Sequence, residues 1–361
     1  MIISRTPYRI SFFGGGTDYP AWYRQHGGRV LGAAINKYCH ITCRYLPPFF
    51  EHRYRVVYSK GESVMRVEDI EHPAVREVLK YLKIEQGVEI HHDGDLPARS
   101  GIGSSSSFAV GLLNAVHALK GVMKPRSELA REATYLEQDV LHETVGSQDQ
   151  VFAAHGGFNH VEFLTNDEVV VTPLTLPAER LRDLNSHLML FFTGISRTAS
   201  VVAQSYVEDL PAKETQLRQL SAMVDEGLSI LRDGGDLARF GRLLDEGWKA
   251  KRSLDRGIST AQVDEMYAAA TAAGALGGKL LGAGGGGFLL LFVPPPHQPR
   301  VRERLGKLIH VPFKFDYSGS RIIFHEAGDD YAEENREREL RAIAPFRDSG
   351  QPVPAAVKRP V

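Results

Sequence analysis

The fold is read first from residues 97–107, Pro97-Ala98-Arg99-Ser100-Gly101-Ile102-Gly103-Ser104-Ser105-Ser106-Ser107. Apolar residues follow at helical spacing, at Phe108, Leu112, Val116 and Leu119. A glycine loop at the start of a helix presents unpaired backbone N–H groups and the positive end of the helix dipole, which together hold phosphate oxygens. No Gly-Lys-[Ser/Thr] ending of a Walker loop is present. The pattern predicts a phosphate loop of another type, with a flexible Gly/Ser linker as the alternative.

Two further glycine runs strengthen this interpretation. Near the start of the chain, a predicted strand enters the loop Gly14-Gly15-Gly16-Thr17-Asp18. Later, Lys279-Leu280-Leu281 leads into the glycine-rich residues 282–287 and then into a buried strand predicted at 288–293. Three such runs, each joined to a regular element, indicate places where the backbone approaches a ligand closely.

With these three motifs in this order, the chain resembles the galactokinase, homoserine kinase, mevalonate kinase and phosphomevalonate kinase (GHMP) superfamily of small-molecule kinases. Pro97 to Ser105 matches the central Pro-x-x-x-Gly-Leu-Gly-Ser-Ser motif, with Ile102 in place of leucine. The resemblance covers about residues 3–326. It implies an α+β fold of two domains, an N-terminal ribosomal-protein-S5-like α/β domain and a C-terminal ferredoxin-like α+β domain, with the active site between them.

Domain limits and elements follow from the sequence pattern. We expect a first domain at residues 1–185, a second at 186–328, and a charged, Pro/Ala-rich tail at 329–361 that is mostly disordered or loosely packed. The first domain is expected to alternate strands at 2–13, 30–46, 54–58 and 88–92 with two helices. One helix follows residues 97–107, called the serine loop below, and the other follows Pro125. In the second domain the expected strands are 188–192, 288–293, 313–317 and 322–325, and the expected helices 212–232, 236–252 and 260–273.

The composition limits the class of partner. The 361 residues include 43 basic and 44 acidic side chains, so no overall charge attracts nucleic acid or a membrane surface. No apolar run reaches the roughly 20 residues that span a bilayer, and the first residues do not form a signal-peptide pattern. We expect a cytoplasmic enzyme whose partners are ATP and a sugar or sugar phosphate, with no nucleic-acid or membrane partner. A homo-oligomer is left open.

The resemblance implies ATP as phosphate donor and Mg²⁺ as the metal. The residues implied to bind the nucleotide are Pro97, Gly101, Ile102, Gly103, Ser104, Ser105 and Ser106. Ser105 matches the position whose hydroxyl ligates magnesium. Because a hydroxyl is a weak neutral ligand, a carboxylate is needed as well. Glu137 is the candidate, since it precedes Asp149 by 12 residues, the interval between the magnesium-ligating glutamate and the catalytic aspartate in galactokinases.

Asp149 matches the aspartate of the superfamily's Gly-x-x-Asp segment, here Gly146-Ser147-Gln148-Asp149. The resemblance implies that it takes or orients the proton of the attacking sugar hydroxyl, with positioning contributing more than basicity. Glu143 is the nearby rival. Arg9 matches the motif-one arginine near the acceptor hydroxyl and the transferring phosphoryl group, where a fixed guanidinium stabilises developing charge. An arginine on a strand edge and an aspartate capping a helix are the structural alternatives.

The acceptor side is implied to consist of Asp18, Gly15, Gly16 and Thr17 of motif one, and Gly285 and Gly286 of motif three. Galactokinase has Gly-Glu-His-Thr-Asp where this chain has Gly14-Gly15-Gly16-Thr17-Asp18. The change removes polar contacts and adds room, which favours a larger acceptor than galactose. A terminal phosphate on that acceptor needs basic groups. The candidates are Arg197 and Lys251, with Lys249 and Arg252 as alternatives.

Motif one most resembles bacterial kinases that phosphorylate the anomeric hydroxyl of D-glycero-D-manno-heptose 7-phosphate to the 1,7-bisphosphate, with fucokinases as near relatives. The resemblance therefore implies an ATP- and magnesium-dependent sugar 1-kinase that serves nucleotide-activated heptose and surface polysaccharide. Two alternatives remain. One is a fucokinase-like enzyme acting on an unphosphorylated sugar, and the other is a non-catalytic sensor of sugar and nucleotide, because a fold does not fix function.

Overall fold

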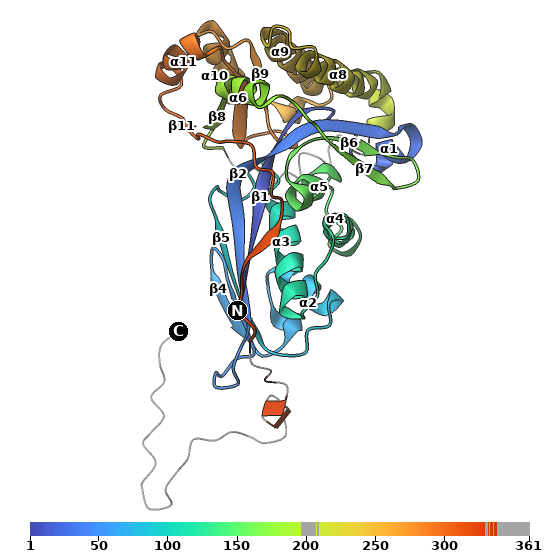
Figure 1. The fold of residues 1–361 in the computed structure, drawn as a ribbon, viewed down its shortest axis with the longest axis vertical. Helices are drawn as coiled ribbons and strands as arrows, with labels where there is room; N and C mark the ends of the chain where they lie inside the picture. Colours follow the sequence, from blue (N-terminus) through green and yellow to red (C-terminus); the bar gives the residue numbers. More distant parts are fainter. Residues whose placement is uncertain (196–206, 208, 329–330, 332, 335, 338–361) are drawn as a thin grey trace, which may run out of the picture.

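The structure, a computed structural model, describes residues 1–195, 207, 209–328, 331, 333–334 and 336–337. Two long antiparallel strands, β1 (Ile2–Phe13) and β2 (Gly28–Tyr45), run through the centre of the molecule (Figure 1). Their pairing shifts register between Pro7 and Tyr8, where proline has no N–H to donate to a ladder. Arg9 and the first glycine loop follow this shift, so the strand delivers both to the upper end of the sheet.

The larger sheet has the strand order β12-β1-β2-β5-β3-β4. β2 is long enough to pair with two strands in turn, through residues 28–33 with β6 and through residues 39–45 with β5. β7 pairs with the outer edge of β6. The remaining strands of this sheet are β3 (Tyr54–Val57), β4 (Gly61–Val64), β5 (Val88–Gly94), β6 (Phe158–Phe163), β7 (Val169–Pro173) and β12 (Arg321–His325).

Helices cover one face of this sheet, as Figure 1 shows. The central one is α3 (Ser104–Leu119), which packs on β1 and β2 and is buried on nearly every side. A helix that is apolar all round belongs inside a protein, and this one is enclosed by the sheet and its helical neighbours. Those neighbours are α2 (Pro73–Tyr81), α4 (Arg126–Tyr135), the π-helical turn Leu136–Val140 and α5 (Gln148–His155).

A second, four-stranded antiparallel sheet with the order β11-β8-β10-β9 forms the upper part of Figure 1. Its central strands are fully apolar, in keeping with their burial between helices and the first domain. α9 packs on β9 and contacts β1, and α8 packs on α9 and on the strands β1 and β2. The elements here are β8 (Leu188–Phe192), α8 (Glu214–Arg232), α9 (Ala238–Arg252), α10 (Ala261–Ala272), β9 (Gly277–Leu280), β10 (Phe288–Phe292), α11 (Gln298–Arg304) and β11 (Ile309–His310).

Most of the expected elements are present, and the two-domain α+β fold is confirmed. The domain limits stay a prediction, but β12, placed by sequence in the second domain, pairs with β1 of the first. The expected tail at 329–361 lies almost entirely outside the described residues. Five helices are present that sequence periodicity did not predict: α1 (Pro20–His26), α2, α5, α6 (Ala178–His187) and α11.

The strand expected at 313–317 was wrong. This segment makes a single bridge, between Phe315 and Ile35. The reason lies in β2, whose pairing with β6 ends at Ala33 and whose pairing with β5 begins at Cys39. Only a short stretch of that edge is open to a third partner, so an extended apolar segment finds room for one pair and no ladder.

Candidate active site

The serine loop opens α3 and adopts the conformation that a phosphate cradle requires. Gly103 caps the helix with φ 73° and ψ 30°, and Gly101 also has a positive φ, 80°. Arg99 shares this left-handed conformation at φ 57°, which is uncommon for a residue with a Cβ. Alternating left-handed residues turn successive N–H groups toward one concave side, next to the positive end of α3. The loop predicted from sequence is therefore an ordered turn at the start of a helix.

The four consecutive serines at residues 104–107 have four different environments. Ser104 Oγ accepts a hydrogen bond from the Arg99 N–H at 3.1 Å, and Ser105 is exposed. Ser106 Oγ donates to Glu137 Oε2 at 2.7 Å, and Ser107 Oγ donates to the Pro7 carbonyl at 2.9 Å. Two hydroxyls thus fix the helix to its neighbours, while Ser105 is exposed at the surface of the loop.

Motif three packs directly on the serine loop. A Cβ added to Gly101 would lie 2.4 Å from the Leu281 carbonyl oxygen, and one added to Gly282 would lie 2.5 Å from Gly101 Cα. The Phe288 N–H donates to the Ser100 carbonyl at 3.1 Å. Only glycine permits this contact between backbones, so motifs two and three form one continuous loop surface. The expectation that motif three lies against the serine loop is confirmed.

Arg9 and Asp149 form the centre of this surface. Arg9 Nε donates to Asp149 Oδ1 and Arg9 Nη2 to Asp149 Oδ2, both at 2.7 Å, while Nη1 donates to the Gly101 carbonyl at 2.6 Å. Arg9 is only 4% exposed, whereas the side chain of Asp149 is 24% exposed. The bidentate geometry fixes the carboxylate against the start of α3 and leaves part of it open to an incoming group. The two residues that the sequence assigned to catalysis are therefore adjacent.

Glu137 lies in the π-helical turn after α4, fully buried behind the serine loop. It accepts from Ser106 and from the amide nitrogen of Gln150, whereas its Oε1 atom has no hydrogen-bond partner in the described part of the chain. Burial raises the pKa of its carboxyl to about 7, and the charge of Glu143 adds to the rise against the Ser106 hydrogen bond. An unpartnered carboxylate oxygen in a buried place is costly unless a ligand reaches it.

These residues fit a magnesium ion. Glu137 Oε1 and Gln150 Oε1 are both buried oxygens without a partner among the described residues, and the Ser105 side chain is close enough to Glu137 to act on the pKa of its carboxyl. Oxygen donors with one carboxylate are what Mg²⁺ takes when nucleotide phosphates complete its shell. The described residues contain no cluster of three or more His, Cys, Asp or Glu side chains that would bind a metal without a nucleotide. Ser105 and Glu137 would hold the ion.

The first glycine loop places Asp18 beside this centre. Asp18 is buried, accepts from the Gly16 N–H at 2.9 Å and from the Gln148 N–H at 3.4 Å, and burial raises its pKa. A Cβ on Gly146 would lie 1.9 Å from Asp18 Oδ2, so a side chain there would displace the carboxylate. Gly15 and Gly16 line the same loop.

Thr17 requires a correction. Its side chain is fully buried, and its hydroxyl bonds the Gly14 carbonyl and accepts from the Arg29 N–H at 3.0 Å. It therefore shapes the loop and cannot offer its hydroxyl to a sugar. The sequence reasoning missed two other polar groups here, Ser11 Oγ and Gln148 Oε1, which are buried without a partner among the described residues. Both lie beside Gly15. The alternation of side chains along β1 was the only feature of the sequence that could have pointed to Ser11.

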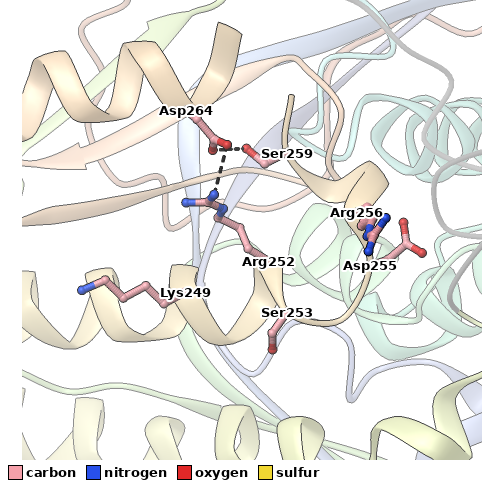
Figure 2. A pocket seen from close by; sticks show the side chains of 7 residues that line it. All are labelled: Lys249, Arg252, Ser253, Asp255, Arg256, Ser259 and Asp264. Atoms are coloured by element: carbon pink, nitrogen blue, oxygen red, sulfur yellow. Dashed lines mark hydrogen bonds and ion pairs between the residues drawn. The ribbon is translucent and has the colours of Figure 1, made fainter. Parts of the chain in front are cut away.

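The basic residues of α9 separate onto two sides of the helix. Lys251 is buried and donates to the Gly282 carbonyl, while Lys249 and Arg252 lie outside and pair with Asp245 and Asp264. Figure 2 shows Lys249 and Arg252 on the wall of a pocket of about 430 Å³, which Ser253, Asp255, Arg256 and Ser259 also line. Arg197 lies outside the described residues. Gly285 and Gly286 pack against backbone of residues 258 and 195.

Family models match the chain in the two places where this geometry lies. The GHMP kinase N-terminal domain matches residues 70–157, and the GHMP kinase C-terminal domain matches residues 226–310. The chain carries both domains of a GHMP kinase. The serine loop and Asp149 fall within the first match, and Lys251 and motif three within the second.

Two of the chain's relatives are named as kinases of a sugar or a sugar phosphate. The chain is 28% identical over 297 residues to the D-glycero-alpha-D-manno-heptose 7-phosphate kinase of Campylobacter jejuni, which covers 78% of this chain and 86% of the relative. It is 28% identical over 310 residues to an L-fucokinase/L-fucose-1-P guanylyltransferase of Bacteroides fragilis, covering 73% of this chain and 32% of that longer protein.

Among solved structures, the GHMP kinase is similar to a D-glycero-D-manno-heptose 1-phosphate kinase from Bacteroides thetaiotaomicron. The TM-score is 0.73 at 27% identity, with 90% of this chain and 100% of that chain covered. In the described residues, no helix has the length and apolar character needed to cross a membrane.

Proposed function

We propose that this GHMP kinase transfers the γ-phosphoryl group of ATP to the anomeric hydroxyl of D-glycero-D-manno-heptose 7-phosphate. The product is the 1,7-bisphosphate, a precursor for nucleotide-activated heptose. The bidentate Arg9–Asp149 pair at the start of α3 carries the phosphotransferase assignment, because it sets a carboxylate beside a phosphate loop. The names of the relatives from Campylobacter jejuni and Bacteroides thetaiotaomicron support a heptose phosphate as acceptor.

Each step of the reaction has a residue suited to it. The N–H groups of the serine loop bind the ATP phosphates, and Asp18 accepts hydrogen bonds from sugar hydroxyls, with Gly15 and Gly16 leaving room for the ring. Asp149 accepts the proton of the anomeric hydroxyl as its oxygen bonds to phosphorus, and Arg9 holds that carboxylate in place. Ser105 and Glu137 would hold a magnesium ion, which would supply positive charge to the phosphates.

A coupled ADP-release assay tests the proposal. Magnesium-ATP is offered with heptose 7-phosphate, mannose 6-phosphate, mannose, fucose and galactose, and phosphorus NMR identifies any product. We expect turnover on heptose 7-phosphate and a new anomeric phosphate signal. Turnover on free fucose or mannose alone would replace the heptose assignment with a fucokinase-like activity. Binding of sugar and nucleotide without turnover on any sugar would indicate a sensor.

A further inference from the structure

Lys251 is a buried amine at the junction of the two domains. It projects from the last turn of α9 and is 7% exposed, and its Nζ donates to the Gly282 carbonyl of motif three. Gly282 in turn packs on Gly101 of the serine loop. Arg9 Nη1 donates to the carbonyl of that same Gly101. Lys251 and Arg9 therefore approach the two touching glycine loops, each bonded to one of them.

Arg9 and Lys251 differ in how many of their N–H donors already have an acceptor and in whether their charge is balanced. Arg9 directs Nε, Nη1 and Nη2 to Asp149 and Gly101, and its charge is balanced by the carboxylate. Lys251 makes one hydrogen bond to a neutral carbonyl and has no ion pair with a carboxylate among the residues that the structure describes. A buried ammonium without a counter-ion is unfavourable, so a site that retains one is suited to an anion that arrives later.

Lys251 faces four charged or titratable groups. These are Arg9 from β1, Asp18 from the first glycine loop, Asp149 from α5 and Lys279 from β9. Lys279 is buried and donates to the Phe12 carbonyl at 3.0 Å, and burial lowers its pKa well below the ordinary lysine value. Lys251 Nζ carries three N–H donors and, among the described residues, uses one of them, on the Gly282 carbonyl.

We propose that Lys251 is a catalytic residue whose Nζ donates to the phosphoryl group as that group passes from ATP to the sugar. The inference rests on the proposed function. In this step the anomeric oxygen forms a bond to the γ-phosphorus while the bond from that phosphorus to the bridging oxygen breaks. The hydroxyl proton goes to Asp149, and ADP leaves with the bridging electron pair. Lys251 gains and loses no proton, and its charge matches charge on the transferring oxygens.

This position differs from the role that sequence suggested, contact with a terminal phosphate at the far end of the acceptor. In the pyranose form, the 7-phosphate of a heptose is carried by a two-carbon arm on C5, across the ring oxygen from the reacting hydroxyl on C1. The charge of Asp149, the residue assigned to that hydroxyl, acts on Lys251. The proposal therefore places Lys251 at the reacting end of the sugar.

A pH dependence follows. Burial, and then the charge of Arg9, lowers the pKa of Lys251 from 10.5 to about 8. The free enzyme loses the ammonium proton as pH rises through that value. We expect kcat/KM, which reports the free enzyme, to fall on the alkaline side with a midpoint near pH 8.

The test uses Lys251→Met, which keeps length and removes charge, and Lys251→Arg, which keeps charge. Lys249→Met is the matched control, because Lys249 is on the same helix but is 69% exposed and paired with Asp245. Steady-state rates are measured from pH 6.5 to 9.5 with the best sugar of the panel. Calorimetry compares the affinity for magnesium-ADP with that for magnesium-ADP and aluminium fluoride, which imitates the transferring phosphoryl group and needs no turnover. Thermal unfolding checks that each variant folds.

We expect Lys251→Met to lose roughly 10²-fold in kcat, together with the alkaline limb and the extra affinity that aluminium fluoride gives. Lys251→Arg should recover part of the rate without the limb near pH 8, and Lys249→Met should behave as wild type. Unchanged kcat in Lys251→Met would overturn the inference. So would an equal loss of affinity for both ligands, since that is the signature of a lysine that only holds Gly282. Failure of the heptose assignment appears separately, in the wild-type sugar panel.

Discussion

Asp149 and Glu137, the two carboxylates compared at this site, differ in burial and in whether a cationic side chain balances their charge. Asp149 accepts hydrogen bonds from Nε and Nη2 of Arg9 and remains partly exposed, so its charge is balanced before any ligand arrives. Glu137 is 1% exposed, receives only neutral donors, and keeps one oxygen without a partner in the described chain. Under the proposed function, the protein itself preorganises the acid that acts on the hydroxyl, whereas the second carboxylate would be completed by a cation bound with the nucleotide.

The largest effect is expected from Asp149→Asn, which removes the proton acceptor and leaves Arg9 with an unbalanced charge. Turnover should fall by roughly 10³-fold, while affinity for magnesium-ADP stays close to wild type because the phosphate loop is intact. Rapid-quench rates and calorimetry measure the two quantities. Asp167→Asn, at an exposed pair with Arg24, is the control. Retained turnover in Asp149→Asn would transfer the role to Glu143.

Glu137→Gln should lower the activity of the enzyme and raise the stability of its fold. Turnover and the magnesium response should fall, by roughly 10²-fold in kcat, because the amide is a poor ligand. The pKa of Glu137 rises from 4.5 to about 7 in the folded protein, so the fold holds this proton more tightly than the unfolded chain does. The ionised form therefore destabilises the fold progressively as pH rises from about 4.5 to 7, by on the order of 3 kcal/mol above that range.

Thermal unfolding without metal at pH 5 and pH 8 measures this stability effect. Glu137→Gln should unfold at a higher temperature than wild type at pH 8, and the gain should shrink at pH 5, where the wild-type carboxyl is already protonated. A variant less stable than wild type at both pH values would show that Glu137 is structural.

A smaller effect is expected from Ser105→Ala. Its hydroxyl is exposed on the serine loop and contributes one neutral ligand. The magnesium concentration for half-maximal rate should rise roughly fivefold, equivalent to about 1 kcal/mol, with kcat at saturating magnesium little changed. A magnesium titration of the rate is the measurement, and an unchanged titration curve excludes Ser105 from the metal site.

The smallest effect is expected from Ser106→Ala. Ser106 is buried and supports Glu137 with one hydrogen bond. Its loss should lower the free energy of unfolding of the metal-free protein by about 1 kcal/mol. The fold-change in kcat should be smaller than the fold-change in magnesium requirement expected for Ser105→Ala. Ser107→Ala, which loses a bond to the Pro7 carbonyl instead, separates a general loss of stability from an effect on Glu137. A kcat loss in Ser106→Ala as large as that of Glu137→Gln would mean that Ser106 is itself a ligand.

Sequence predicted the motifs better than their side-chain environments. The apolar spacing after Ser107 predicted α3, and the family resemblance singled out Arg9 and Asp149, which the structure brings together. The π-helical turn that carries Glu137 has no periodic signature, because it adds a residue to a turn whose apolar spacing still reads as helix. Sequence could not show that Thr17 faces inward, since its burial depends on the pairing of its loop with the start of β2, where the Arg29 N–H donates to its hydroxyl.

Lys251 illustrates the same limit within one helix. Lys249, Lys251 and Arg252 look alike as a basic cluster, and only the packing of α9 on β9 decides which of them faces motif three. The strand expected at 313–317 failed for a related reason, because an apolar extended segment forms a strand only if a neighbouring edge is open. Both outcomes depend on long-range contacts that local sequence does not encode.

The pairing of β12 with β1 has a consequence for how the chain is made. β1 is synthesised first, but its outer partner begins at Arg321, and Thr6 meets Ser320 only then. At about 5–20 residues per second, ribosomal synthesis leaves that edge uncovered for roughly 20 to 60 s. An unpaired strand edge is a template for intermolecular association. The nascent chain of this kinase is therefore a candidate for chaperone protection until the last strand has emerged.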